Sequence, residues 1–216
     1  MAKLSESAKK FGRYMQEAGF RLDQGSNDPP VPAEVRPYPY LDQWRILTER
    51  GWYAYRLEDH SLILFNEEVG PSFSYYPCPL DVKPRHIFAR DRGVVGADMY
   101  SSEFTEEYEM HLLTAKLKPH VVPIRYDYDL KGFNNKSHPV AHLHFGHDSE
   151  IRVGCGRKWT PIAFGLFVLR QNYPEFWRRL LDKPTASGLG RVIRNGLVLI
   201  DDIHRNPIAL TEVFLD

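Results

Sequence analysis

Two segments decide the fold that the sequence predicts: VVPIRYDYD at residues 121–129 and AHLHF at residues 141–145. Charged or polar side chains alternate with apolar ones in both, which is the period of a β-strand with one face against a core. The polar loop KGFNNKS at residues 131–137 lies between them, so the two strands are expected to pair as a hairpin. In that hairpin, a row of one arginine and two aspartates would lie beside a row of two histidines.

The flanking segments extend this hairpin into a sheet with helices. Alternating aromatic and aliphatic residues predict strands over residues 52–57, 61–65 and 72–76, with a turn at 58–60, and shorter strands at 197–200 and near 213. Apolar spacing of three to four residues predicts helices over residues 4–18, 40–50, 105–117, 160–173 and 175–181. Together these elements predict a single α+β domain, in which helices pack on one face of an antiparallel sheet.

The N-terminal part of the chain differs in composition from the rest. Five prolines fall within residues 24–39, and proline disfavours both helix interiors and central strands. We therefore expect residues 1–39 to form an N-terminal helix followed by an extended Pro-rich strap, and residues 40–216 to form the α+β domain.

The composition excludes several classes of protein. The chain has 216 residues, of which 43% are hydrophobic, and this excludes wholesale disorder. Its longest apolar run covers residues 161–169, against roughly 20 residues needed to span a bilayer, so no membrane segment is expected. The two cysteines, Cys78 and Cys155, form no Cys-x-x-Cys motif, which disfavours a thiolate zinc site. We expect a cytoplasmic protein with reduced thiols.

Charge is distributed unevenly along a chain whose formal net charge is zero. Residues 1–108 hold 13 basic and 17 acidic residues, whereas residues 109–216 hold 15 and 11. Nine basic and three acidic residues fall within 150–194, directly after the histidine-rich segment, where they could steer a polyanion toward it. The alternative is that they are solvated on helix surfaces. Neutrality excludes a polycationic nucleic-acid coat but leaves an anionic substrate open.

Five of the nine histidines lie within residues 120–147, and they suggest three kinds of site. In the first, His142 and His144 act as general acid and base on a phosphodiester, and Arg125 stabilises the developing negative charge. In the second, His142, His144 and Asp127 bind a divalent transition metal, which activates water. In the third, Arg125 and the histidines bind an anionic ligand without chemistry.

Further candidate substrate contacts surround the cluster, namely His138, His147, Arg152, Arg157 and Lys158. The last two belong to an expected loop, GCGRK at residues 154–158, whose glycines and cations could hold a phosphate without the spacing of a P-loop. The alternative for the whole cluster is an ordinary strand with a polar outer face, where a surface ion pair contributes less than about 1 kcal/mol.

Four strings resemble a bacterial family known only as a domain of unknown function: YYPCP (75–79), RYDYD (125–129), HPVAHLHFG (138–146) and TPIAF…VLRQNY (160–173). The resemblance covers roughly residues 40–181 and implies no catalytic residue, because that family has no established activity. The Arg-Tyr-Asp, His-Pro and His-x-His arrangement is also similar to small toxins of bacterial toxin–antitoxin pairs. That similarity implies a nucleic-acid-directed role in conflict or antiviral defence, by analogy.

The leading hypothesis is a cytoplasmic bacterial phosphodiesterase or nuclease acting on RNA or another nucleotide polyanion. Its catalytic residues would be His142, His144, Asp127 and Arg125. A divalent metal is the one cofactor that the residues suggest, and acid–base catalysis would need none. The rival hypothesis is a binding or assembly protein without chemistry, which docks a partner protein encoded beside it. The sequence leaves the substrate open, and it is equally compatible with a monomer and a homo-oligomer.

Overall fold

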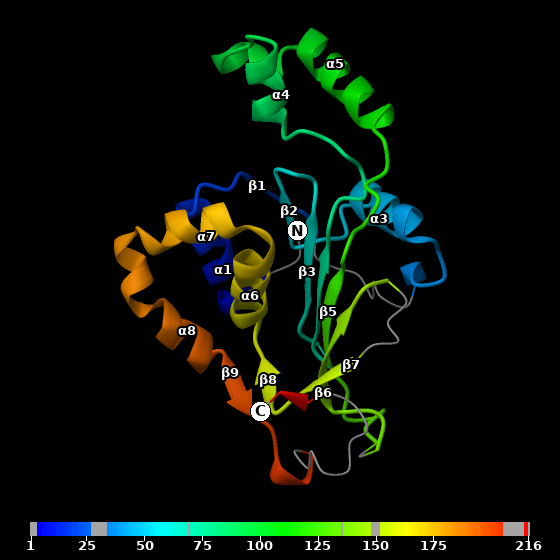
Figure 1. The fold of residues 1–216 in the computed structure, drawn as a ribbon, viewed down its shortest axis with the longest axis vertical. Helices are drawn as coiled ribbons and strands as arrows, with labels where there is room; N and C mark the ends of the chain where they lie inside the picture. Colours follow the sequence, from blue (N-terminus) through cyan, green and yellow to red (C-terminus); the bar gives the residue numbers. More distant parts are fainter. Residues whose placement is uncertain are drawn as a thin grey trace.

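The centre of the molecule is a twisted β-sheet, shown in Figure 1. The computed structural model describes residues 4–26, 34–68, 70–134, 136–147, 152–204 and 214–215. The strands of the sheet are β1 (Leu22–Gln24), β2 (Tyr55–Leu57), β3 (Leu62–Asn66), β4 (Ser72–Tyr76), β5 (Ile124–Tyr128), β6 (Ala141–Phe145), β7 (Arg152–Cys155) and β10 (Phe214–Leu215). Among the described residues, their spatial order is β1-β2-β3-β4-β5-β6-β7-β10. Neighbouring strands are antiparallel, except that β10 runs parallel to β7.

Helices and a second, two-stranded sheet complete the fold. The helices are α1 (Glu6–Glu17), α3 (Tyr40–Glu49), α4 (Arg85–Asp91), α5 (Ser102–Leu113), α6 (Pro161–Asn172), α7 (Pro174–Leu181) and α8 (Leu189–Asn195), with the 3₁₀-helices η1 (Gly96–Tyr100), η2 (Pro184–Gly188) and η3 (Asp202–His204). The small sheet pairs β8 (Arg157–Trp159) with β9 (Leu197–Leu199). The predicted α+β class is confirmed.

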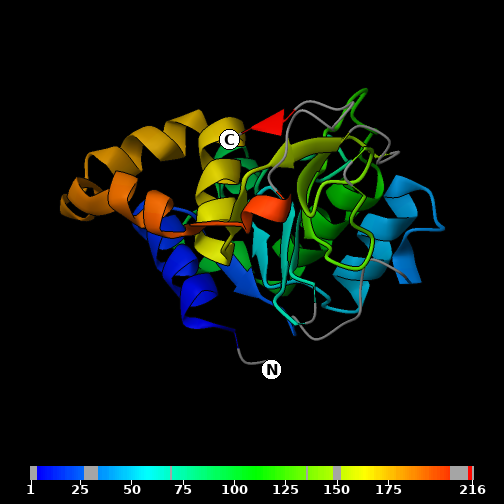
Figure 2. The same cartoon turned by 90° about the horizontal axis from the view of Figure 1, so that it is seen from below.

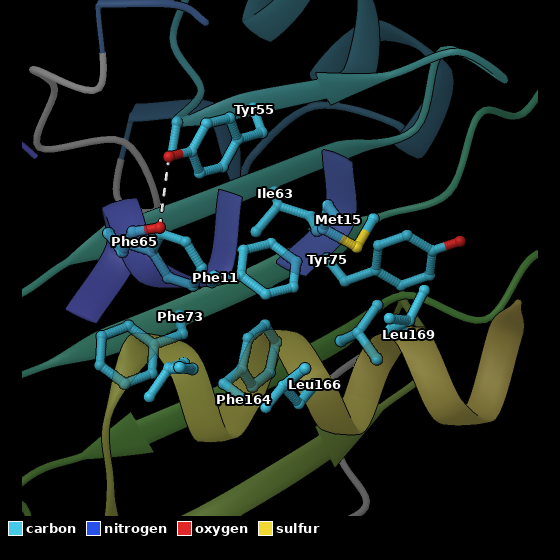
Figure 3. Close-up of a cluster of buried hydrophobic side chains, with 14 of the residues drawn as sticks. Phe11, Met15, Tyr55, Ile63, Phe65, Phe73, Tyr75, Phe164, Leu166 and Leu169 are labelled. Atoms are coloured by element: carbon cyan, nitrogen blue, oxygen red, sulfur yellow. Dashed lines mark hydrogen bonds between the residues drawn. The ribbon is translucent and has the colours of Figure 1, made fainter. Parts of the chain in front are cut away.

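Helices α1 and α6 cover one face of the main sheet, as Figure 3 shows in close-up. Phe11 of α1 and Phe164 of α6 are fully buried there, against Phe65 and Phe73 of the sheet. Burying one such ring contributes roughly 1.5–3 kcal/mol. The two helices approach closely because α6 has Gly165 at their contact, where a Cβ atom would lie only 2.4 Å from the Phe11 ring.

Helix α3 packs against the opposite face, at the β2–β4 end of the sheet; in Figure 2 it lies on the far side of the sheet from α1 and α6. Leu62, Leu64 and Tyr76 point to this face because they alternate with residues that point to the other one. They pack against Leu47 of α3, so the expectation that helices pack on one face of the sheet is wrong: helices cover both faces. The same face continues onto β5 and β6, where the sequence turns polar and the candidate site lies.

Helices α4 and α5, with η1, form a small lobe that extends from one end of the sheet, at the top of Figure 1. Its own buried cluster consists of Phe88, Ala89, Phe104 and Tyr108. The lobe is inserted between β4 and β5, which are nevertheless direct neighbours in the sheet.

Most predicted elements are present within a few residues, and two differ. The helix expected over residues 105–117 spans 102–113 instead, because the Ser101 side chain accepts the Phe104 N–H (3.2 Å) and begins the helix earlier. The loop expected at residues 154–158 is wrong: β7 and β8 occupy it, because pairing with β6 and β9 overrides the local preference of glycine for loops.

Two further expectations concern the Pro-rich strap and membrane-spanning segments. Within the Pro-rich strap expected at residues 24–39, residues 27–33 lie outside the described residues. The helices of the described residues are each too short or too polar to span a lipid bilayer.

Candidate functional site

The predicted hairpin of β5 and β6 is confirmed, and its register places the charged row beside the histidine row. Arg125 lies opposite His144, and Asp127 lies opposite His142. Strand β4 continues the same face on the other side of β5, with Ser72 opposite Asp127. Because paired residues of antiparallel strands share a face, all five side chains gather on the face away from α1 and α6.

Asp127 is the centre of this cluster. Arg125 donates from Nε to Asp127 Oδ2 at 2.7 Å, and the Ser72 hydroxyl donates to Oδ1 at 2.6 Å. His144 Nε2 lies 3.4 Å from the same Oδ2, and His142 Nε2 lies 3.9 Å from it. Both carboxylate oxygens are therefore engaged, and Oδ2 faces two imidazoles at once.

The two histidines are held in fixed orientations inside the protein. Their exposed fractions are 1% for His142 and 2% for His144, and their rings meet edge to face at 4.8 Å between centroids. His142 Nδ1 lies 2.7 Å from the carbonyl oxygen of Pro139, which can only accept, so Nδ1 carries the proton. The lone pair of neutral His142 is then on Nε2, the atom that faces Asp127. His144 Nδ1 has no hydrogen-bond partner among the described residues.

Burial sets the charge state of the cluster. It lowers the pKa of His142 to about 4, with the nearby His144 as a second cause, and it lowers the pKa of His144 as well. Burial alone would raise the pKa of Asp127, but hydrogen bonding with His144 and the charge of Arg125 outweigh it and hold that pKa well below its usual value. The cluster therefore consists of one carboxylate and two neutral imidazoles.

This donor set fits a divalent transition metal. One ligand atom from each of Asp127, His142 and His144 lies within 4.8 Å of the others. Ligand atoms about 2.1 Å from a tetrahedral ion lie about 3.4 Å apart, close to the 3.4 and 3.9 Å separations from Asp127 Oδ2. The hydrogen bond from His142 Nδ1 to a backbone carbonyl is the outer contact that orients metal-binding histidines. We refer to these three residues as the triad.

A cavity of about 330 Å³ opens beside the triad. Arg125 and Ser74 line it from the sheet, and Arg36, Tyr40 and His147 are among the residues that line its other walls. Arg125 thus touches both the cavity and the carboxylate of the triad. Asp127, His142 and His144 do not themselves line the cavity, and Arg125 connects it to them.

The structure places the predicted substrate contacts at different distances from the triad. His138 extends the histidine row, with its ring 4.9 Å from that of His142, and Arg152 lies opposite His144 on β7. His147 lines the cavity.

Arg157 and Lys158 are not brought to the cluster. They lie on β8, where the Lys158 ammonium sits 4.7 Å from the ring of Tyr128, whose side chain points to the other face of the sheet.

Most of the nine basic residues within 150–194 also lie away from the triad in the folded structure. Most of the arginines among them belong to α6, α7 and α8, and α6 packs on the face opposite the triad. Arg170 and Arg179 stack there on aromatic rings of α7. Arg152 is the member that pairs directly with the cluster, so the steering that the sequence suggested has no basis in these helices.

Sequence reasoning missed three residues of the site: Ser72, Ser74 and Arg36. The two serines alternate with apolar residues in SFSYY, and this pattern marks a polar face without showing which strand lies beside it. Arg36 precedes α3 in the segment that was expected to be a strap, and its position beside Arg125 depends on tertiary packing.

Comparison with known protein families identifies a match that covers most of the chain. The model of a protein family described as "Uncharacterized conserved protein (DUF2290)" matches residues 17–195. The chain belongs to this family. The expected membership in a family of unknown function is thereby confirmed, whereas the similarity to small toxins stays a prediction. No curated protein matches the chain, and no solved structure does.

Proposed function

We propose that this protein is a metal-dependent phosphodiesterase or nuclease that acts on RNA or another nucleotide polyanion. The observation that supports this most is that His142 and His144 both face one carboxylate oxygen of Asp127. Arg125, which donates to the same carboxylate, also lines a cavity. Two imidazoles and a carboxylate suit zinc, manganese or iron. The adjoining guanidinium supplies the positive charge that a phosphate needs.

The state of the histidines favours metal binding over acid–base catalysis. A general acid must carry a proton near neutral pH, but burial disfavours the imidazolium form of His142 and His144. Neutral imidazole is the form that binds a metal. His142 Nδ1 is also engaged with Pro139, which leaves a single nitrogen free to act.

The proposed roles follow from these contacts. Asp127, His142 and His144 would hold the metal, which supplies Lewis-acid polarisation of a phosphoryl oxygen and activation of water. Ser72 and Arg125 fix the orientation of the Asp127 carboxylate. Arg125 also presents its guanidinium to the cavity, where it would bind a phosphate oxygen and neutralise the charge that develops on it.

The test measures metal binding before activity. Purified protein is treated with EDTA, and thermal unfolding is followed with added Zn²⁺ or Mn²⁺. Saturation at about 100 times Kd stabilises the folded state by about 2.7 kcal/mol. We expect this shift in the wild type and its loss in Asp127→Asn and His142→Gln, variants chosen to keep side-chain volume in a buried site. His120→Ala is the matched control, because His120 belongs to the same histidine-rich segment but is exposed.

Cleavage of a fluorescent single-stranded RNA and of bis(p-nitrophenyl) phosphate is then measured with the metal that binds. We expect activity in the wild type and His120→Ala, and its loss in His142→Gln, with circular dichroism showing that the variant is folded. Absence of a metal-dependent shift in the wild type, or full activity in His142→Gln, would overturn the proposal. A metal shift with no cleavage of either substrate would favour the rival hypothesis of binding without chemistry.

A further inference from the structure

The cavity beside the triad is built by elements that the sequence places far apart. Its walls include the segment before α3, the first turn of α3 itself, and strands β4 and β5. Gln43 of α3 ties these together: its Nε2 donates to the carbonyl oxygens of Tyr38 (2.8 Å) and Arg36 (3.4 Å). Tyr76 of β4 donates from its hydroxyl to Gln43 Oε1 at 3.5 Å. The backbone that carries Arg36 is therefore held at the cavity wall.

The described residues that line the cavity carry a positive charge. Arg36 and Arg125 both line it, and no carboxylate does among the described residues that form its walls. Asp127 offsets one of the two charges through its ion pair with Arg125. Among the described residues, no carboxylate forms an ion pair with Arg36. Burial, and then the charge of Arg125, lower the pKa of the Arg36 guanidinium, whereas the charge of Asp127 raises it. Both guanidinium groups line the same cavity, so an anion between them would be attracted by both.

Aromatic rings form part of the remaining walls. The Tyr40 ring is stacked on Tyr76, with centroids 5.9 Å apart, and meets the His147 ring edge-on at 5.5 Å. All three rings line the cavity, and His147 is exposed. Flat aromatic surfaces beside a cationic wall are the combination that binds a base and its phosphate together, because stacking suits the base and a guanidinium suits the phosphate.

We infer that this cavity binds one nucleotide unit, with the phosphate between Arg36 and Arg125 and the base against Tyr40 and His147. The inference rests on the proposed function, because it names the class of substrate that reaches the triad: a free nucleotide or the end of a single strand. A volume of about 330 Å³ lies at the low end of the range for small-ligand pockets, roughly 300–1,000 Å³. The two histidines of the triad lie beyond it and are buried, so we expect a free nucleotide or a strand end to reach them more readily than the phosphates of a duplex.

The test is isothermal titration of the full chain in EDTA, so that binding is measured without metal and without turnover. The probes are AMP, inorganic phosphate and adenosine. We expect AMP to bind more tightly than either of the other two. Arg36→Ala should weaken AMP binding by roughly 10- to 100-fold, which corresponds to the loss of a charged hydrogen bond. Arg36→Lys should recover part of that loss.

Two further variants separate the parts of the site. Arg45→Ala removes the same charge from α3 at an exposed position that does not line the cavity, so AMP should bind to it as to the wild type. His147→Ala should weaken the binding of AMP while leaving that of phosphate unchanged. Arg36 and His147 are both exposed, so neither substitution is expected to unfold the protein.

The outcomes distinguish this inference from the proposed function. AMP binding no tighter than that of phosphate, or unchanged by Arg36→Ala, would overturn the nucleotide site even if the metal-dependent cleavage assay succeeds. Arg36-dependent binding of AMP by a protein that neither binds metal nor cleaves RNA would support the site and overturn the catalytic proposal instead.

Discussion

The contact between α1 and α6 allows a quantitative test of the packing. Replacing Gly165 by alanine would add a Cβ atom 2.4 Å from Cδ2 of Phe11, 2.5 Å from Cε2 and 2.7 Å from Cγ. Carbon atoms in favourable contact lie about 3.5–4.0 Å apart, so the ring and the new methyl must separate by roughly 1 Å. Phe11 is fully buried against Tyr55 and Phe65, which leaves it little room to move.

Two opposing effects set the magnitude. Overpacking a well-packed core costs about 1–3 kcal/mol. A contact as short as 2.4 Å to a fully buried ring places Gly165→Ala in the upper part of that range, about 2–3 kcal/mol. Alanine is favoured over glycine inside a helix by about 1 kcal/mol, which offsets part of this cost. We therefore expect Gly165→Ala to lower the free energy of unfolding by about 1–2 kcal/mol. For a chain of this length, that corresponds to a fall in Tm of about 2–8 °C.

Urea unfolding followed by circular dichroism measures the effect, and Gly190→Ala in α8 is the matched control. At Gly190 the nearest atom to a new Cβ is the flexible Arg194 side chain at 3.5 Å, so the same substitution should stabilise the protein by about 0.5 kcal/mol. The double variant Phe11→Leu/Gly165→Ala should lose less stability than the sum of the losses measured for the two single variants, because the leucine side chain relieves the contact with the new methyl group. Equal or greater stability of Gly165→Ala than of the wild type would refute the close packing of α1 on α6.

Two other predictions concern titratable groups outside the site. Burial, with a smaller contribution from Arg56, lowers the pKa of His60 to about 4. As pH falls from about 6.5 to 4, the unfolded chain gains a proton that folded His60 does not accept, so up to about 3 kcal/mol of stability is lost. Urea unfolding across this pH range should show a smaller loss in His60→Asn, since asparagine tolerates the positive φ there, and an equal loss would count against this cause. Burial raises the pKa of Cys78 to about 11 and that of Cys155 to about 12, so Ellman's reagent should label neither thiol until the protein is unfolded; rapid labelling of the native protein would contradict their burial.

The parts of the fold that the sequence predicted well are those with a local cause. The alternation in residues 141–145 placed His142 and His144 on one face, and the structure confirms the strand with the same bounds. The short polar loop predicted that the acidic row lies beside the histidine row, whereas the register that sets Asp127 opposite His142 is known from the structure alone. A two-residue period and a neighbouring partner are enough to position these side chains.

The parts that were missed or misplaced have a non-local cause. Ser72 lies on β4 and contacts Asp127 of β5, although the lobe of α4 and α5 separates these two strands along the chain. No local pattern in the sequence shows that the two strands are neighbours. The basic residues after the cluster are close to it along the chain, but α6 carries them to the opposite face of the sheet. Charge counted along a sequence therefore says little about charge around a site until the packing of the helices is known.

The lobe also affects the order in which the chain can assemble. β4 and β5 pair although residues 77–123 lie between them, and the entropic cost of closing such a loop grows with the logarithm of its length. The two connections to the lobe meet at a β-bridge between Leu80 and Leu117. Once this bridge has formed, the open segments between it and the two strands are a few residues long, and β4 meets β5 much as it would in a tight hairpin. A lobe that folds on its own cluster first thereby lowers the effective contact order of the strand that carries Arg125 and Asp127.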